Sequence, residues 1–268
     1  HDPGARPMTD RGAVTHEVRG TALWITLSRP DAMNAINDAV IDGLTAALDA
    51  ADSDHALRCI VIRAEGRAFC AGADLKAVQE KTASGTMDGF VDRLLAVFNR
   101  IEAFPRPVVA AVNGLALAGG LEMVLCCDLV IAAESAKIGD AHANYGLIPG
   151  GGGSVRLPRK VGPTRAKYLM YTGAFLDAAE LERMGLVNQV VPDDALEETV
   201  SALTARLGEK SPLGLKLMKQ LIDDGLEQPK ETALRNELMA IAVHSRSQDW
   251  AEGLAAFTEK RKPNFIGR

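Results

Sequence analysis

The sequence predicts an α/β core that is followed by a helical C-terminal region. In the first half, short apolar segments rich in β-branched residues alternate with segments of helical periodicity. From Thr164 onward nearly every segment has helical periodicity, and only Val187–Val191 resembles a strand. The 268 residues are 47% hydrophobic and 24% charged, which is ordinary for a globular protein with a sizeable core. We therefore expect an α/β core over residues 8–200 and a helical region over residues 201–268.

Local patterns predict the strands and helices of the core in order. Ala22–Leu27 is short, apolar and bounded by Gly20 and Arg29–Pro30, which indicates a strand. Apolar residues recur at helical spacing in Asn37–Ala51. The same reasoning predicts strands at Cys59–Arg63, Val108–Val112 and Leu129–Ala132, and helices at Phe90–Ala103 and Leu121–Cys127.

The later part of the chain consists mainly of predicted helices, at Thr164–Tyr171, Ala178–Met184, Leu196–Glu209, Leu213–Gly225, Pro229–His244 and Asp249–Lys260. The glycine run 150–153 lacks the Gly-Lys-Ser/Thr sequence that follows a nucleotide phosphate loop. We interpret the run as a tight turn before Ser154–Arg159. Asp128 directly follows an apolar helix, and we interpret it as structural.

Charge and cysteine usage argue against several kinds of partner. The net charge is −5, and the only basic run is Lys260–Arg261–Lys262, so no nucleic-acid partner is expected. The four cysteines include no CxxC pair and no spacing typical of zinc ligands, so we expect no metal site and a reducing compartment.

The chain contains no predicted targeting or membrane-spanning segment. Its longest apolar stretch, Pro107–Ala133, is interrupted by polar and charged residues, so no membrane span is expected. The N-terminus lacks a hydrophobic region, and we expect a cytoplasmic protein. Residues 1–7 precede Met8, and we expect them to be a tag or a processing residue.

A first candidate binding segment follows the Cys59–Arg63 strand. It reads AFCAGADLK over residues 68–76, and its small residues Ala71, Gly72 and Ala73 allow a ligand to approach the backbone closely. The alternative is a plain connection between a strand and a helix, which small residues also favour.

A second segment, NGLALAGGLEMVLCCDLVIA over residues 113–132, places Gly119 and Gly120 at the start of a buried helix. The first N–H groups of a helix have no partner within it, so they can bind an oxyanion there. Glu122 lies in the first helical turn among apolar neighbours, where burial would shift its proton affinity and suit acid–base work. A helix-terminal charge or a structural ion pair is the alternative role.

These two segments resemble the two signature segments of the crotonase (enoyl-CoA hydratase/isomerase) superfamily. The resemblance continues on both sides of them, from about Val18 to Phe265. It implies a crotonase-type core of ββα turns and a helical C-terminal region that mediates assembly into homotrimers or hexamers. It also implies an acyl-coenzyme A thioester as substrate and no permanently bound cofactor.

The resemblance implies roles for individual residues as well. The N–H groups of Ala73 and Gly119 would form an oxyanion hole for the thioester carbonyl. The backbone from Ala71 to Leu75, including Ala73, would hold the adenine end of coenzyme A. Lys260 would contact the coenzyme phosphates, from a neighbouring subunit if the fold requires it. Glu122 matches the first of the two glutamates that hydratases of this family use.

The match departs from the family pattern at the second glutamate. Counting back from Gly146-Leu-Ile-Pro-Gly150, that position holds His142. Histidine exchanges protons near neutral pH, so His142 can replace a carboxylate, or it can merely line the acyl pocket. Asp140 lies two residues away and would project to the same side of an extended segment.

The sequence therefore leaves three functions open. The leading one is hydration of a 2-enoyl-CoA by Glu122 with His142. The second is isomerisation or hydrolysis of an acyl-CoA, because the same oxyanion hole stabilises any thioester enolate. The third is a non-catalytic scaffold or RNA-binding relative, against which Glu122 and the acidic balance argue.

Overall fold

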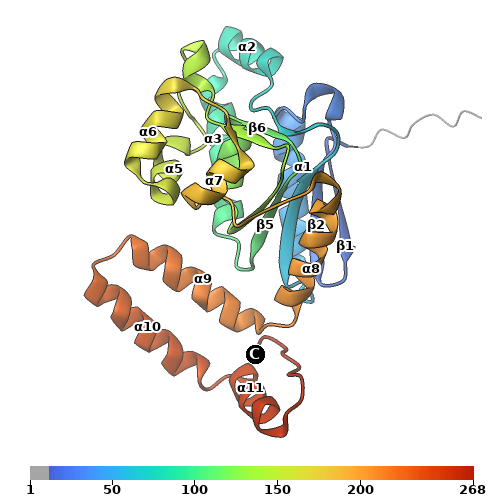
Figure 1. Ribbon diagram of the computed structural model, residues 1–268, viewed down its shortest axis with the longest axis vertical. Coiled ribbons are helices and arrows are strands. Elements are labelled where there is room, and N and C mark those ends of the chain that lie inside the picture. Colours follow the sequence, from blue (N-terminus) through green and yellow to red (C-terminus); the bar gives the residue numbers. More distant parts are fainter. Residues whose placement is uncertain (1–11) are drawn as a thin grey trace, which may run out of the picture.

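The computed structural model describes residues 12–268, so the expectation for residues 1–7 lies outside the described residues. Two β-sheets and their covering helices form the upper body in Figure 1, and the last three helices extend below it. No helix in the described part of the chain combines the length and the apolar character needed to cross a membrane.

The larger sheet has six strands in the order β1-β2-β3-β5-β7-β10. β1 and β2 are antiparallel, and every later pair in the sheet is parallel. The strands span Val14–Arg19 (β1), Ala22–Leu27 (β2), Cys59–Ala64 (β3), Val108–Val112 (β5), Leu129–Ala133 (β7) and Gln189–Val191 (β10).

The smaller sheet has four short strands in the order β4-β6-β8-β9. They span Ala68–Cys70 (β4), Leu115–Leu117 (β6), Lys137–Gly139 (β8) and Leu176–Asp177 (β9). Each strand β3, β5 and β7 of the large sheet is followed along the chain by a strand of the small sheet. This repeated step brings the segments after β4, β6 and β8 together.

Helices cover both faces of the large sheet. Side chains alternate along each strand, so Ile60 and Ile62 of β3 join the main core, whereas Cys59 and Val61 join a second apolar cluster on the other face. The main core is closed by α1 (Asp38–Ser53), α3 (Met87–Glu102), α4 (Gly119–Leu125), α5 (Gly153–Val161), α6 (Pro163–Thr172) and α7 (Ala178–Met184). The second cluster is closed by α8 (Leu196–Gly208).

The C-terminal region is helical, as expected, with α9 at Pro212–Leu226, α10 at Lys230–His244 and α11 at Gln248–Glu259. α9 and α10 form a hairpin that projects from the body (Figure 1) and contain no buried residue. Asp128 ties this hairpin to the core, because its Oδ2 accepts hydrogen bonds from the N–H of Val108 (2.7 Å) and the Nζ of Lys219 (2.8 Å). The structural interpretation of Asp128 is therefore confirmed. The division at residue 200 falls within α8 and stays a prediction.

All seven elements predicted for the first half exist, and their bounds agree to within a few residues. The sequence analysis missed the edge strand β1, the four short strands of the small sheet and the helices α2 (Leu75–Ser84) and α5. Strands of two or three residues are too short to show an alternating pattern, so only the pairing partner reveals them. Short 3₁₀ helices at Pro30–Ala32, His142–Tyr145 and Asp193–Ala195 were also not predicted.

Candidate active site

Two chain segments far apart in sequence meet where β4 and β6 end. β4 and β6 are parallel neighbours, so the residues that follow them, 71–74 and 118–120, emerge side by side. Gly72 has a φ of +100°, and a Cβ at this position would lie 3.5 Å from the nitrogen of Gly119. Glycine is required here because a side chain would separate the two backbones.

The N–H groups of Ala73 and Gly119 are both unused. Ile36 binds the first segment on either side of Ala73, since its N–H donates to Gly72 and its carbonyl accepts from Asp74, both at 2.8 Å. Neither the Ala73 N–H nor the Gly119 N–H donates to an acceptor among residues 12–268. A Cβ at Gly119 would lie 3.7 Å from the nitrogen of Ala73, so the two donors are neighbours.

Gly120 allows the helix α4 to begin at this place. A Cβ at Gly120 would lie 2.1 Å from the carbonyl oxygen of Cys70, a separation that no side chain can adopt. Ala118, just before the helix, has a φ of +49°, which is costly for a residue with a side chain. This strained backbone at Ala118 directs the first turn of α4 toward residues 71–74.

Glu122 lies in that first turn and is buried, with 2% of the residue exposed. Its Oε1 accepts hydrogen bonds from the N–H groups of Gly151 (2.8 Å) and Gly153 (2.9 Å). Its Oε2 accepts none from the described residues, so this oxygen is available for proton exchange. Burial raises the pKa of the Glu122 carboxyl group, and the charge of Asp140 adds to the rise, whereas the two N–H groups and His142 oppose it.

The glycine run that carries these donors is more than the expected turn. A Cβ at Gly151 would lie 2.7 Å from Oε2 of Glu122 and 2.9 Å from Phe98, so only glycine allows the loop to approach the carboxylate. The sequence analysis missed this role, although the glycine run preceding Arg156 was the available signal.

Arg156 also contacts the glycine run, through the carbonyl of Gly151. It donates to the carbonyl of Gly151 (2.9 Å), to Oδ1 of Asn99 (2.6 Å) and to Oε2 of Glu102 (2.7 Å). Arg156 is almost fully buried, so its removal would leave these acceptors without a donor. The loop that binds Glu122 is thereby fixed to α3.

His142 and Asp140 lie together, though not in the extended segment that the sequence suggested. Ala141 has a φ of +62°, and the N–H of His142 donates to the carbonyl of Asp140 (2.8 Å), so the chain turns tightly between them. Nδ1 of His142 lies 3.1 Å from Oδ1 of Asp140. Burial lowers the pKa of His142, but Asp140 and the charge of Glu122 outweigh that effect and raise it above its ordinary value. The structure thus brings His142 into the electrostatic range of Glu122.

Of the remaining residues named from the sequence, Ala71 and Leu75 adjoin the segment of Ala73, whereas Lys260 lies apart from it. The side chain of Leu75, the first residue of α2, is exposed. Lys260 ends α11 and forms no ion pair with a described residue. α2 and α11 lie at opposite ends of the molecule in Figure 1, so Lys260 does not reach Ala71–Leu75 within one chain.

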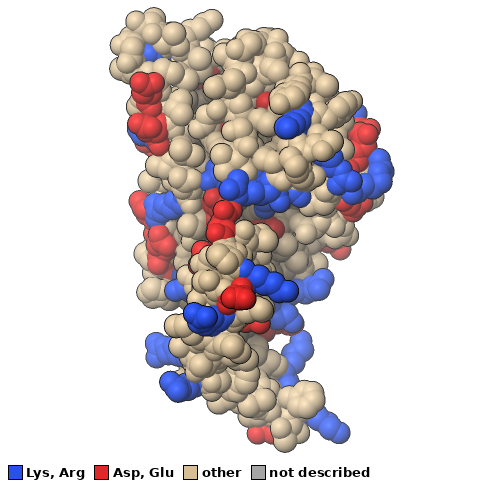
Figure 2. All heavy atoms as spheres, turned by 90° about the vertical axis from the view of Figure 1, so that its left-hand side faces the viewer, with Lys and Arg blue, Asp and Glu red and all other residues tan. Residues whose placement is uncertain are grey.

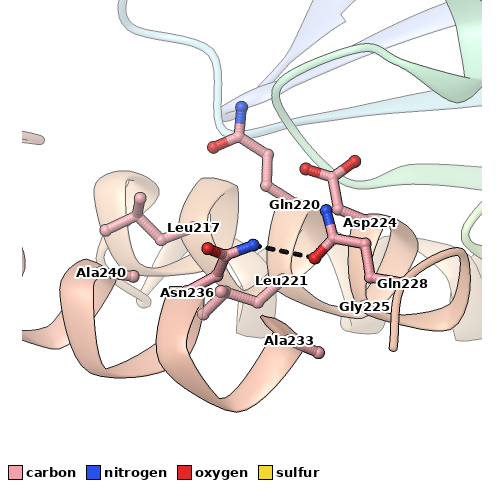
Figure 3. A pocket seen from close by; sticks show the side chains of 9 residues that line it. All are labelled: Leu217, Gln220, Leu221, Asp224, Gly225, Gln228, Ala233, Asn236 and Ala240. Atoms are coloured by element: carbon pink, nitrogen blue, oxygen red, sulfur yellow. Dashed lines mark hydrogen bonds between the residues drawn. The ribbon is translucent and has the colours of Figure 1, made fainter. Parts of the chain in front are cut away.

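Three other features of residues 12–268, namely a cavity, two buried cysteines and the arrangement of possible metal ligands, do not point to another reaction centre. A cavity of about 180 Å³ lies between α9 and α10, where Asn236 donates to Gln228 (2.8 Å) and Asp224 is the only titratable lining residue (Figure 3). Burial raises the pKa of the Cys70 and Cys126 thiols to about 12, so neither is a ready nucleophile. Within residues 12–268, no group of three His, Cys, Asp or Glu side chains is arranged to hold a metal ion.

Known proteins of one family resemble this chain over nearly its whole length. The family model described as enoyl-CoA hydratase/isomerase matches residues 17–268. A crotonyl-CoA hydratase of Syntrophomonas wolfei is 40% identical over 90% of this chain and 93% of its own length. A 2,3-dehydroadipyl-CoA hydratase of Escherichia coli is 37% identical over 92% of this chain and 95% of its own length.

A solved structure also resembles this chain. The crystal structure of an enoyl-CoA hydratase from Bacillus anthracis matches with a TM-score of 0.90 at 35% identity, over 96% of this chain and all of the other. The expected crotonase-type fold with a helical C-terminal region is confirmed. The chain belongs to the enoyl-CoA hydratase/isomerase family of enzymes.

Proposed function

We propose that this protein catalyses the addition of water to a 2-enoyl-CoA thioester, and that the same site catalyses the reverse dehydration. The observation that carries the proposal is Glu122, a buried carboxylate with one oxygen free of partners in residues 12–268, in the helical turn that begins at Gly119, whose N–H, like that of Ala73, has no acceptor there. A carboxylate next to a pair of oxyanion donors is the arrangement that water addition to a conjugated thioester needs.

The oxyanion donors would act on the thioester carbonyl. Attack of water on Cβ of the substrate moves electrons onto the carbonyl oxygen and forms an enolate. The N–H groups of Ala73 and Gly119 would donate to that oxygen, and their backbone is already fixed by Ile36 and by α4. Donors fixed in advance need no reorganisation as the charge develops, and each is worth about 3 kcal/mol of transition-state stabilisation.

Protons must balance at the two substrate carbons. Oε2 of Glu122 would take a proton from the attacking water, whose oxygen forms the new bond to Cβ. His142 would give a proton to Cα, which restores the carbonyl from the enolate. Glu122 then holds one extra proton and His142 lacks one, so a proton passes from Glu122 to His142, directly or through solvent, before the next turnover. The raised pKa values of both groups suit these opposite roles near neutral pH.

Coenzyme A would bind along the backbone of Ala71–Leu75. Lys260 would meet its phosphates from a neighbouring subunit, because the two sites lie at opposite ends of one chain (Figure 1). Family enzymes of this kind act without a permanent cofactor, and we propose the same here. The buried, free cysteines suit the reducing conditions of the cytoplasm, where we place the protein.

We also propose that the chain assembles into a homotrimer or a hexamer. The α9–α10 hairpin exposes large apolar side chains, among them Leu226, Leu238 and Val243. Figure 2 shows a second broad region nearly free of charge in the upper part of the molecule. On α6, Tyr168 and Tyr171 are exposed as well. Exposed apolar areas of this kind are typical of protein–protein interfaces.

His142 also favours a second candidate function. Without a second glutamate, the same oxyanion site and Glu122 would support double-bond migration or thioester hydrolysis. Product analysis separates the three reactions, because hydration gives a 3-hydroxyacyl-CoA, migration gives an isomeric enoyl-CoA, and hydrolysis releases free thiol.

The test is a crotonyl-CoA hydration assay that follows the loss of the enoyl-thioester absorbance. Wild-type protein should be active, and Glu122→Gln should lose at least about a hundredfold in kcat while it still binds coenzyme A. Glu134→Gln removes an exposed carboxylate away from the site and serves as the matched control. An inactive wild type that still binds acyl-CoA would refute hydration of this substrate and direct the search to the other reactions or to a non-catalytic relative.

A further inference from the structure

Asp140 is a buried carboxylate to which neither the sequence nor the family resemblance assigns a function. Its side chain is 2% exposed, and its neighbour His142 has a side chain that is 13% exposed. A buried carboxylate without a partner is costly, so its presence next to the candidate centre calls for a physical reason. Among residues 12–268, Oδ1 of Asp140 and Nδ1 of His142 are both buried and form no well-directed hydrogen bond.

These two unsatisfied atoms lie 3.1 Å from each other. A small rotation of the imidazole ring would align the Nδ1–H group with the carboxylate oxygen. Hydrogen bonds of this kind are often loose in a free enzyme and tighten when the substrate binds. The backbone favours the pairing, because the turn at Ala141 and the bond from the His142 N–H to the Asp140 carbonyl hold both side chains on the same side.

We propose that Asp140 is a positioning residue that holds His142 with Nδ1–H toward Asp140 and Nε2 toward the substrate, so that His142 enters the reaction as the proton donor. The proposal rests on the hydration proposed above. A carboxylate behind an imidazole selects one tautomer and stabilises the protonated ring. Position 142 would then supply a proton to Cα, while Glu122 serves as the base.

The charges around His142 fit this assignment. Asp140 and Glu122 are the charged groups that act on the imidazole, and both favour its protonated form. Arg156 interacts electrostatically with Glu122 but is not among the groups that shift His142, and it is engaged by Glu102, Asn99 and the Gly151 carbonyl. A protonated His142 is therefore stabilised by the charges of two carboxylates, Asp140 and Glu122.

The first test is an NMR titration of wild-type enzyme that carries isotope-labelled histidine. The chain has five histidines, and the spectrum of His142→Gln assigns the resonance of residue 142 by its absence. We expect His142 to titrate above the ordinary range and, when neutral, to carry its proton on Nδ1. A neutral ring protonated on Nε2 would overturn the proposal. This measurement needs no turnover, so it remains informative if the hydratase proposal fails.

The second test compares Asp140→Asn with wild type in the crotonyl-CoA assay across pH. Asparagine keeps the shape and removes the charge, so the pKa of His142 should fall and the alkaline limb of kcat should move to lower pH. The loss of the Asp140 charge also lowers the pKa of Glu122, so the acidic limb should move in the same direction. At pH 8 we expect a loss of about tenfold in kcat with little change in KM.

A merely structural role for Asp140 would lower activity equally at all pH values. Unchanged limbs in Asp140→Asn, together with an unchanged His142 titration, would overturn the proposal. The control is again Glu134→Gln, whose carboxylate is exposed.

Discussion

Oε1 of Glu122 accepts a hydrogen bond from the N–H of Gly151 at 2.8 Å, across an interval of 29 residues. This bond joins the helix that follows β6 to the loop that precedes α5. It fixes one carboxylate oxygen and leaves the other free. The reactivity proposed for Glu122 therefore depends on a backbone group that neither signature segment contains.

Gly151→Ala should lower kcat itself, and not merely weaken substrate binding. The new Cβ would lie 2.7 Å from Oε2 of Glu122, so the carboxylate or the loop must move. We expect a loss of about 1–3 kcal/mol in the free energy of unfolding, as for other overpacked sites, and a fall in kcat. Urea denaturation and the crotonyl-CoA assay measure the two effects.

Gly89→Ala is the matched control for that variant. Gly89 lies in α3, and a Cβ there would meet no atom within 4 Å. Since alanine favours a helix over glycine, this change should leave activity intact and keep or slightly raise stability. Equal kcat values for Gly151→Ala and Gly89→Ala would contradict the role given to the glycine loop.

Arg156→Ala should destabilise the protein by about 2–4 kcal/mol, because it leaves the carbonyl of Gly151 and the amide of Asn99 without their donor. Activity should fall too, as the loop that binds Glu122 loses its support. Arg159, three residues later, forms an exposed ion pair with Glu227, so Arg159→Ala should leave the free energy of unfolding nearly unchanged. Chemical denaturation of both variants gives the comparison, and equal losses would refute it.

Glu122→Gln should be more stable than wild type at pH 8. Burial raises the pKa of Glu122 in the folded state, so its stabilising contribution is complete below the unfolded pKa and is lost as pH rises through the folded pKa. Glutamine avoids the buried charge and still accepts from both glycine N–H groups. The advantage should shrink as the pH is lowered toward about 4.3, the ordinary pKa of a glutamate.

Urea midpoints of both proteins at pH 5 and pH 8 measure this difference. A wild type that is more stable than the variant at pH 8 would show that the carboxylate is better compensated than its burial suggests. Glu134→Gln, an exposed change, should show no such dependence on pH.

Leu238→Asp should reduce the native mass of the protein. Leu238 lies on α10 with 68% of its surface exposed, on the hairpin that we propose as an assembly surface. A charge there must be desolvated in an interface, which weakens association. Val18→Asp, on the edge strand β1, changes an exposed apolar residue outside the hairpin and should leave the mass unchanged. Light scattering after gel filtration measures both, and an unaltered mass for Leu238→Asp would contradict the role of α10.

Long elements could be predicted from the sequence, whereas very short ones could not. Helices such as Asp38–Ser53 and Met87–Glu102 contain several turns, so their apolar spacing is visible in the chain. β6 and β8 contain three residues each, and only pairing with the neighbouring strands of the small sheet identifies them as strands. These short strands nevertheless place residues 71–74, 118–120 and 140–142 next to one another.

The sequence by itself determined the family and indicated the two candidate oxyanion segments and Glu122, because these depend on local glycine and small-residue patterns that a single strand–turn–helix step imposes. Only the tertiary structure decided which oxygen of Glu122 is free, that Gly151 and Gly153 hold the other one, and that Asp140 faces His142. Those contacts join segments separated by long stretches of chain or by an unforeseen turn at Ala141. Their geometry follows from the pairing of the two sheets, which no local pattern encodes.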